Sequence, residues 1–259
     1  MSEEVGTLEG RVAIVTGAGS RTEGIGTGRA ATITLARAGV RVLAVDRDLG
    51  AAEHTAELAG PDAAEILPFV ADVTDAASCR AMVDAALERW GRLDILNNNL
   101  GTEGPGTVLT DWEGWERAIA LNVRTAVLAS AAAIPHLPAG GSIVNTSSIA
   151  ATRPRGITPY STTKGAIIAL TKSMALDHAA QGVRVNCIAP GPIYTPMSAE
   201  GMTPELRRRR QEASPLRTEG DAWDVARALR FLVSDDARWI TGVVLLVDGG
   251  VSLQSPARG

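Results

Sequence analysis

Tyr160 and Lys164 lie four residues apart in Pro159-Tyr-Ser-Thr-Thr-Lys, a segment that is expected to begin a helix. Residues at this spacing share one helix face, so both side chains can point into one pocket. A phenol titrates at about pH 10, and a neighbouring ammonium together with a positively charged ring favours its phenolate form. Tyr160 is therefore predicted to act as a general acid or base. The chain has only two tyrosines and two lysines, which argues against a chance pairing.

A glycine-rich loop is the second chemical feature. It runs Thr16-Gly-Ala-Gly-Ser-Arg-Thr-Glu-Gly-Ile-Gly, after an apolar run at residues 12–15 and before a helix expected over residues 25–38. Bare backbone at a helix N-terminus can approach a pyrophosphate, which a side chain would obstruct. A simple strand-to-helix turn is the structural alternative. The loop is predicted to bind a dinucleotide through Gly17, Arg21, Gly24, Ile25 and Gly26.

Asp46 follows the second apolar run, residues 41–45, and lies 20 residues after Gly26 (46 − 26). An acidic side chain at this place binds the ribose hydroxyls of adenosine and repels a 2′-phosphate, which favours NAD over NADP. Arg21 and Arg47 could instead support that phosphate, so NADP stays open as the less favoured cofactor. A cap at the end of the strand is the structural alternative for Asp46.

Short apolar runs alternate with helical patterns along the rest of the chain, at residues 66–70, 95–96, 142–145, 183–188 and 243–247. This alternation predicts the α/β class: a single doubly wound Rossmann-type domain over residues 1–259, with a parallel sheet flanked by helices on both faces. Residues 190–218 are rich in proline and hold four consecutive arginines at 207–210. We expect them to form a substrate flap, with its arginines in local ion pairs to Glu205 and Glu212.

Composition argues against several classes of partner. The formal net charge of −4 and a pI of about 5.5 give no general attraction for nucleic acid or for an anionic membrane. Cys79 and Cys187 match neither a disulfide framework nor a zinc site, and the three histidines lack metal spacing, so no metal is expected. The start of the chain lacks the apolar core of a secretory signal. Residues 118–137 are apolar but interrupted, and are interpreted as a buried helix. A cytoplasmic protein is predicted.

These features together resemble the short-chain dehydrogenase/reductase family over residues 10–250. The resemblance places Tyr160-x-x-x-Lys164 at the family's active-site pair. Ser148, in Asn145-Thr-Ser-Ser, is implied to hold the substrate oxygen. Asn122, in Leu121-Asn-Val, is implied to anchor a water that links Lys164 to solvent. The catalytic set is then Asn122, Ser148, Tyr160 and Lys164.

The resemblance also implies cofactor contacts outside the glycine loop. Asp72-Val73 is similar to the family's adenine contact, Asn98-Asn-Leu-Gly to its NNAG segment, and Pro190-Gly-Pro-Ile-Tyr-Thr to its nicotinamide clamp. The residues implied are Asp72, Val73, Asn99, Ile193 and Thr195, with Tyr160 and Lys164. Relatives often pair the long helices near Asn122 and Tyr160 and bury the last strand, so a homotetramer or homodimer is implied.

Three positions depart from the family pattern. Gly17 and Gly24 are seven positions apart instead of the family's usual four, an apparent insertion of three residues. Asn97 and Leu100 replace an apolar residue and an alanine, which could alter the floor of the pocket. Ser148 precedes Tyr160 by twelve positions instead of the more usual thirteen, so Ser147 is a weaker candidate for the same role.

The predicted function is hydride transfer between NAD and a small secondary alcohol or ketone. An NADPH-dependent ketone or 3-oxoacyl reductase on the same scaffold is the nearest alternative. A dinucleotide-binding sensor without turnover is an alternative of another class, suggested by Asn97 and the altered loop. The substrate-choosing residues fall in residues 149–159 and in the flap, where no shared pattern names the alcohol.

Overall fold

The computed structural model describes residues 8–20, 22–103, 106–154, 156–199 and 201–254. Its centre is a seven-stranded sheet in the order β3-β2-β1-β4-β5-β6-β7, with every neighbouring pair parallel. The strand order reverses between β1 and β4, which is where a doubly wound sheet opens a crevice for a ligand. The predicted fold class is confirmed. The strands are β1 (Val12–Thr16), β2 (Arg41–Asp46), β3 (Ile66–Val70), β4 (Ile95–Asn98), β5 (Ser142–Thr146), β6 (Arg184–Pro190) and β7 (Val244–Val247).

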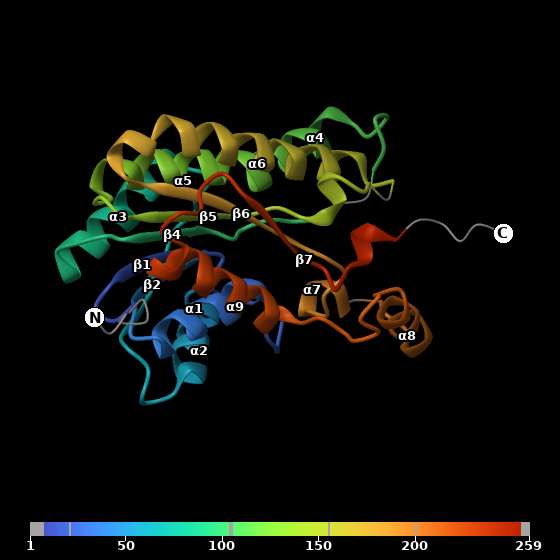
Figure 1. Ribbon diagram of the computed structural model, residues 1–259, viewed down its shortest axis with the longest axis horizontal. Helices are drawn as coiled ribbons and strands as arrows, with labels where there is room; N and C mark the ends of the chain where they lie inside the picture. The colour runs from blue at the N-terminus through green and yellow to red at the C-terminus, as the bar shows by residue number, and fades with distance from the viewer. Residues whose placement is uncertain (1–7, 21, 104–105, 155, 200, 255–259) are drawn as a thin grey trace.

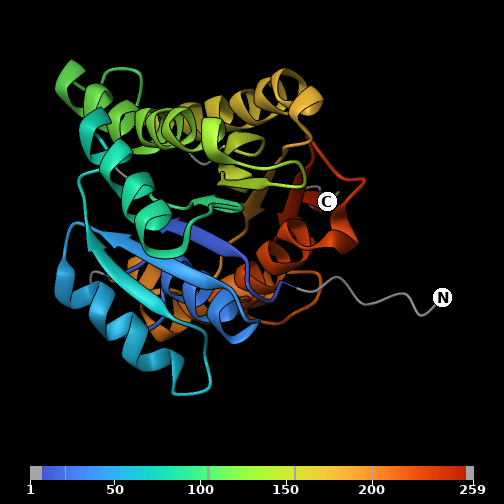
Figure 2. The ribbon, with the colours of Figure 1, turned by 90° about the vertical axis from the view of Figure 1, so that its left-hand side faces the viewer.

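Helices cover both faces of the sheet, as Figures 1 and 2 show. One face carries α3 (Ala76–Trp90), α4 (Trp112–Ile119), α5 (Thr125–Ala133) and α6 (Thr158–Asp177). The other face carries α1 (Thr27–Arg37), α2 (Leu49–Ala59) and α9 (Ala222–Val233). The short helices α7 (Pro196–Ala199) and α8 (Pro204–Glu212) follow β6 and lie beyond the end of the sheet. Single helical turns are η1 (Ala120–Arg124), η2 (Ile134–His136), η3 (Ile149–Ala151), η4 (Ala179–Gln181), η5 (Asp235–Ala237) and η6 (Val251–Leu253).

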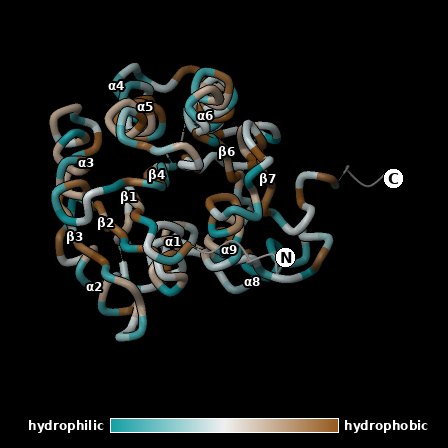
Figure 3. The backbone as a smooth tube through the Cα atoms, turned by 60° about the vertical axis from the view of Figure 1, so that its left-hand side comes forward, coloured by the Kyte–Doolittle hydropathy of each residue, from teal (hydrophilic) through white to brown (hydrophobic). Residues whose placement is uncertain are grey.

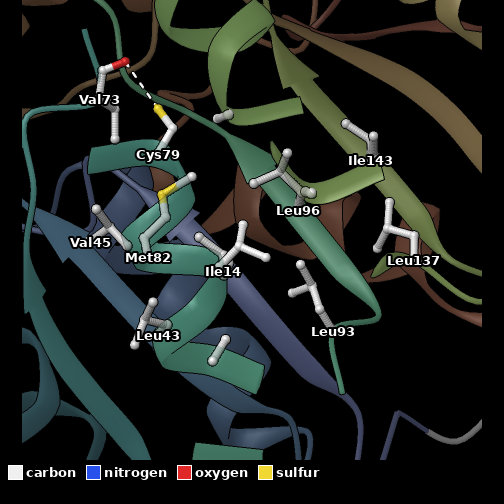
Figure 4. Close-up of a cluster of buried hydrophobic side chains, with 14 of the residues drawn as sticks. Ile14, Leu43, Val45, Val73, Cys79, Met82, Leu93, Leu96, Leu137 and Ile143 are labelled. Atoms are coloured by element: carbon white, nitrogen blue, oxygen red, sulfur yellow. Dashed lines mark hydrogen bonds between the residues drawn. The ribbon is translucent and has the colours of Figure 1, made fainter. Parts of the chain in front are cut away.

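Alternating side chains along the strands fill two separate cores. Ile14 belongs to the core under α3 and α5, whereas its neighbour Val15 belongs to the core under α1 and α9. Figure 4 shows the first core, where Cys79 and Met82 of α3 lie over the strand residues and the Cys79 thiol donates to the Val73 carbonyl. Apolar stretches follow the inner strands in Figure 3. Each fully buried aliphatic side chain contributes about 2 kcal/mol to the stability of the fold.

Helix α1 begins two residues later than predicted. The structure starts it at Thr27, with Gly26 as the N-cap, where Ile25 had been expected to be the first residue. Gly28 lies in its first turn, and a Cβ there would come within 1.8 Å of the Gly17 carbonyl oxygen. Only glycine permits this close packing of the helix on the first turn after β1.

The apolar segment at residues 118–137 is not a fully buried helix. It belongs to a helical run, Trp112–His136, whose length and composition would suffice to cross a membrane, yet only 33% of its most apolar window is buried inside the chain. One face packs on the sheet through residues such as Ala126 and Ala129. The opposite face leaves Trp112, Ile119 and Val127 exposed. The outer side of this helical run is therefore apolar and uncovered within the described part of the chain.

Candidate active site

Helix α6 holds the phenol and the ammonium on one face, as predicted from their spacing. Tyr160 lies in its first turn and Lys164 one turn later, with the Lys164 Nζ 5.8 Å from the centre of the Tyr160 ring. Pro159 stands at the start of the helix, where its fixed φ is favourable and its missing N–H is not needed. The pair therefore occupies the N-terminal end of α6.

The Lys164 ammonium is buried, with 3% of the residue exposed. It donates to the Thr146 carbonyl oxygen at 2.9 Å, at the last residue of β5. A Cβ on Gly101 would lie 2.9 Å from Nζ and 3.3 Å from the Asn122 Oδ1, so glycine leaves the room that the ammonium occupies. Burial lowers the pKa of Lys164 to about 8. The lysine thus points into the protein at the end of the sheet and away from bulk water.

The Tyr160 hydroxyl differs from expectation in its proton affinity. Burial raises the pKa of Tyr160 to about 12, and a hydrogen bond with Ser148 offsets only part of this rise. The carboxylate of Glu103 raises the pKa of Tyr160 further, a contribution that sequence reasoning did not identify. The predicted lowering required both an ammonium and a charged ring beside the phenol. With only the ammonium beside the phenol, burial has the larger effect on the pKa of Tyr160, so the phenol stays protonated.

Ser148, and not Ser147, faces the phenol. Ser148 caps η3, where its Oγ accepts from the Ala150 N–H at 3.1 Å, and it lies near enough to the Tyr160 hydroxyl to lower the pKa of Tyr160. Ser147 is buried, and its Oγ donates to the Lys164 carbonyl oxygen at 2.7 Å. The twelve-residue spacing therefore still brings Ser148 to the reactive side, while Ser147 holds the backbone of α6.

Asn122 lies in η1, a single π-helical turn between α4 and α5. π-Helical turns are rare in proteins, and those that occur are often found at functional sites. The Asn122 amide is satisfied by protein groups: Oδ1 accepts from the Thr102 N–H at 2.8 Å, and Nδ2 donates to the Thr102 carbonyl at 3.1 Å and to the Thr163 Oγ1 at 3.0 Å. Asn122 therefore joins the loop after β4 to α6. Its predicted role in a water relay stays a prediction.

The glycine loop lies between β1 and α1, where the first strand ends. Gly17 has a positive φ of 66°, Gly26 is the N-cap of α1, and Gly28 packs on Gly17. These three glycines match the turn, approach and packing positions of a dinucleotide fingerprint. Gly24 and Ile25 then lie in the lengthened part of the loop, and Gly17 and Gly26 are nine positions apart, not the seven counted to Gly24. Sequence reasoning missed Gly28, although Gly26-Thr-Gly28 repeats the glycine spacing of Gly24-Ile-Gly26.

Asp46 is the last residue of β2, as predicted, and its carboxylate faces the glycine loop. Its Oδ2 accepts from the Gly19 N–H at 2.9 Å, and its Oδ1 accepts from the Asp48 N–H at 3.2 Å. A Cβ on Gly19 would lie 2.9 Å from the Asp46 Oδ2, so the loop approaches the carboxylate through bare backbone. The Asp46 carboxylate is thus fixed in orientation at the edge where a ribose is expected.

The implied adenine contacts follow β3. Asp72 is exposed, and its Oδ1 accepts from the N–H and the hydroxyl of Thr74 at 2.9 and 2.7 Å, which lowers the pKa of Asp72. The Val73 side chain is buried in the core beneath α3 (Figure 4), so Val73 can meet a ligand only through its backbone. Both contacts stay predictions.

The remaining residues implied to contact the cofactor lie after β4 and after β6. The Asn99 Nδ2 donates to the Gly17 carbonyl at 3.3 Å, which ties the end of β4 to the glycine loop. The Thr195 Oγ1 accepts from the Ser198 N–H at 3.4 Å, and the Ser198 Oγ donates to the Ile193 carbonyl at 3.0 Å. Arg21 lies outside the described residues.

The flap begins beside the glycine loop. A Cβ on Gly24 would lie 3.2 Å from the Pro196 Cγ at the start of α7. The arginines of α8 form local ion pairs, as predicted, with Arg208 bonding Glu205 and Glu212. Arg207 also stacks on the Tyr194 ring at 3.8 Å and pairs with Glu219, contacts that the sequence did not reveal. Arg207 therefore fastens α8 to Tyr194, in the segment that follows β6.

The two unusual residues near β4 have different surroundings. Asn97 is buried and its Nδ2 donates to the Val144 carbonyl of β5 at 3.0 Å, so its amide is satisfied within the sheet. Leu100 packs against the first core and lies 3.2 Å from the Cβ position of Gly17. Leu100, not Asn97, is thus the substitution that borders the glycine loop. Within the described ranges no cluster of three His, Cys, Asp or Glu side chains is arranged to hold a metal ion.

Comparisons with known proteins agree with this geometry. A family model described as "Enoyl-(Acyl carrier protein) reductase" matches residues 19–252. Glucose 1-dehydrogenase 2 of Bacillus subtilis (strain 168) is 34% identical over 252 residues, covering 95% of this chain and 96% of the relative. The 2-(R)-hydroxypropyl-CoM dehydrogenase of Xanthobacter autotrophicus is 39% identical over 249 residues, covering 92% and 97%.

A solved structure is also similar over nearly the whole chain. The 3-ketoacyl-(acyl-carrier-protein) reductase from Brucella melitensis, complexed with NADH, superposes with a TM-score of 0.84 at 34% identity. The match covers 95% of this chain and 100% of the reductase. The similarity therefore includes the glycine loop, the sheet edge and α6 together.

The buried lysine predicts a pH-dependent contribution to stability. The pKa of Lys164 is about 8 in the folded chain and 10.5 in its ordinary state, so between these values the unfolded chain binds more protons. The free energy of unfolding of the wild type, relative to Lys164→Met, should then rise by about 1 kcal/mol per pH unit from pH 8 to 10. Denaturant unfolding of both cofactor-free proteins at several pH values measures it. A difference that is flat or falls with pH contradicts the buried ammonium.

Proposed function

This chain belongs to the short-chain dehydrogenase/reductase family of NAD(P)-dependent oxidoreductases that act on CH–OH groups, and from that premise we propose that it transfers a hydride between NAD and a small secondary alcohol or its ketone. The observation that carries the proposal is the Tyr160 hydroxyl, which lies beside Ser148 and one helical turn from the buried Lys164 ammonium. These groups lie at the carboxyl ends of the strands, where the glycine loop also lies.

Ser148 and Tyr160 are proposed to hold the oxygen of the substrate between their hydroxyls. Tyr160 exchanges a proton with that oxygen, as a base in alcohol oxidation and as an acid in ketone reduction. Lys164 holds the ribose next to the nicotinamide ring, and its ammonium supplies a positive charge near the Tyr160 hydroxyl. Asn122 keeps the loop after β4 against α6, so that the ammonium keeps its place. When bound, the nicotinamide supplies the hydride acceptor or donor.

NAD is the proposed cofactor. Asp46 presents a fixed carboxylate toward the ribose position, and its negative charge opposes a 2′-phosphate. The residues fit the group, because Gly19 meets Asp46 through backbone alone and Gly26 leaves the N-terminus of α1 bare. The proposed contacts are Gly17, Gly26 and Gly28, in place of Gly24 and Ile25, together with Asp46, Asp72, Val73, Asn99, Ile193 and Thr195.

An NADPH-dependent ketone or 3-oxoacyl reductase is the second candidate. It draws support from the 3-ketoacyl-(acyl-carrier-protein) reductase among the similar structures, although that structure contains NADH. The arrangement of Ser148 and Tyr160 beside the buried Lys164 serves both candidates equally. Asp46 therefore separates them, because only its carboxylate acts against the additional phosphate.

Tyr160→Phe tests the proposed chemistry. The phenol oxygen is lost while the ring and Lys164 remain, so turnover should fall about a thousandfold and NADH binding should persist. The assay is a panel of secondary alcohols and ketones followed at the absorbance of the reduced cofactor, with NADH affinity measured by fluorescence titration. Tyr194→Phe is the matched control, because it removes the only other phenol, in the flap. Turnover retained by Tyr160→Phe would reject the mechanism.

Asp46→Asn tests the choice of cofactor. Loss of the carboxylate charge should lower the ratio of kcat/KM for NAD to that for NADP by about tenfold, because repulsion of the 2′-phosphate disappears. Asp48→Asn removes a neighbouring charge that caps α2 and should leave the ratio close to wild type. Steady-state kinetics with both cofactors give the ratio. A wild-type preference for NADP, or an unchanged ratio in Asp46→Asn, contradicts the assignment.

The uncovered helix face supports assembly into a homodimer or homotetramer. Val127 on α5 is 42% exposed, and Leu246 on the terminal strand β7 is 41% exposed. Sedimentation velocity should give a multiple of the 26.9 kDa chain. Val127→Glu should lower that multiple, because it places a charge in the apolar contact. Leu58→Glu, at a residue of similar exposure on α2, should not. A wild-type monomer at micromolar concentration rules the assembly out.

A further inference from the structure

Arg29 on α1 is a cation with only 2% of its surface exposed, and the proposed reaction does not use it. Its Nη1 donates to the Gly24 carbonyl at 2.6 Å, its Nε to the Thr55 Oγ1 at 3.0 Å and its Nη2 to the Ala51 carbonyl at 3.3 Å. Burial lowers the pKa of Arg29, and the negative charge of Asp46 partly offsets this. A buried cation is costly unless its donors are satisfied, and here one guanidinium fork satisfies three acceptors.

Thr55 extends the same network to the other end of the glycine loop. Its hydroxyl accepts from Arg29 and can donate to the Ala18 carbonyl at 2.9 Å or to the Ala51 carbonyl at 3.0 Å. Helices α1 and α2 lie side by side in Figure 1, so the two side chains meet between them. Arg29 and Thr55 therefore fasten the loop near its start, at Ala18, and near its end, at Gly24.

The fastened loop is longer than the fold requires. Gly17 and Gly26 are nine positions apart, and a longer loop has more conformations to lose when it is ordered. Gly24 has a positive φ of 112° and lies against Pro196 of the flap, so the carbonyl that Arg29 holds belongs to the residue that meets the flap. The next residue after Ala18 is Gly19, which bonds Asp46.

We propose that Arg29 is a positioning residue for the dinucleotide. It holds the loop at Gly24 and, through Thr55, at Ala18, so that the Asp46 carboxylate and the bare N-terminus of α1 present one ordered surface to the adenosine ribose and the pyrophosphate. The proposal rests on the dinucleotide-dependent function given above. Arg29 acts through the loop, since its donors are already directed to protein acceptors. An ordered surface binds more tightly because less ordering remains to be done on binding.

Arg29→Met tests the proposal, because methionine keeps much of the length and none of the donors. The Kd for NADH should rise about tenfold, the effect of losing one charge-assisted hydrogen bond. The Kd for ADP should rise by a similar factor, because ADP carries the adenosine ribose and the pyrophosphate without the nicotinamide. Fluorescence titration of NADH and calorimetric titration of ADP against the purified full chain measure both constants.

Arg37→Met is the matched control. Arg37 also lies on α1 and also bonds carbonyls of α2, donating to Ala59 at 3.1 Å and Leu58 at 3.2 Å, but at the far end from the glycine loop. It should leave both dissociation constants at their wild-type values. If Arg29→Met does not fold, Thr55→Val removes the linking hydroxyl without removing a charge, and the Kd for NADH should then rise about threefold.

Three results would overturn the proposal: an NADH Kd within about twofold of wild type in Arg29→Met or in the substituting Thr55→Val, an equal weakening in Arg37→Met, or weaker NADH binding with unchanged ADP binding. Failure of the wild-type chain to bind NADH at all would instead reject the proposed function, and the inference with it. Wild-type binding with no effect of Arg29→Met rejects the inference alone.

Discussion

The hydrogen bond from the Lys164 ammonium to the Thr146 carbonyl joins helix α6 to the last residue of β5. It fixes the helix at the carboxyl ends of the strands, where a ligand is expected to bind. Ser147 bonds the Lys164 carbonyl from the same side, so this one residue is held at both its backbone and its side chain. Because Tyr160 is one turn earlier on α6, docking at Lys164 also sets the position of the phenol. A compact ammonium fits here since Gly101 leaves the space for it.

Burial has opposite consequences for the two members of this pair. It makes charge less favourable on both side chains, lowering the pKa of Lys164 and raising that of Tyr160. Each change disfavours the charged form, so the chain by itself holds a protonated phenol. A positive charge entering the pocket would act on the Tyr160 hydroxyl in a medium that screens it less than water does. The same burial that opposes ionisation thus makes the proton affinity of Tyr160 sensitive to what is bound beside it.

The sequence predicted the fold class, the seven strands and the facing of Tyr160 and Lys164, because these follow from hydrophobic period and helical spacing. It misplaced the start of α1, because Gly24-Ile-Gly26 and Gly26-Thr-Gly28 satisfy the same spacing. Only the contact of Gly28 with the Gly17 carbonyl distinguishes them. The outer face of Trp112–His136 was misjudged because apolar composition does not say what covers it. No local motif marks Glu103, Thr55 and Arg29, because the contacts of Glu103 with Tyr160, of Thr55 with Ala18 and of Arg29 with Thr55 join residues far apart in sequence.

Lys164 and Arg29, two of the buried cations among the described residues, act in a similar way on carbonyls near the proposed dinucleotide site. Where the chain leaves a parallel sheet, its backbone carbonyls lose their hydrogen-bond partners in the neighbouring strand. A site that binds a ligand there has no room for a side chain that would cover these carbonyls on the side of the ligand. The Lys164 ammonium donates to the Thr146 carbonyl from the interior of the protein. The Arg29 guanidinium donates in the same way to the Gly24 and Ala51 carbonyls. An apolar side chain of equal size would leave the Thr146 and Gly24 carbonyls without these donors, at about 1–3 kcal/mol each. The planar fork suits the loop, where several acceptors must be held together, and the ammonium suits the narrow space beside Gly101. Interior side chains therefore hold the backbone in place at the carboxyl ends of the strands, and no side chain is needed on the side of the backbone that faces the ligand.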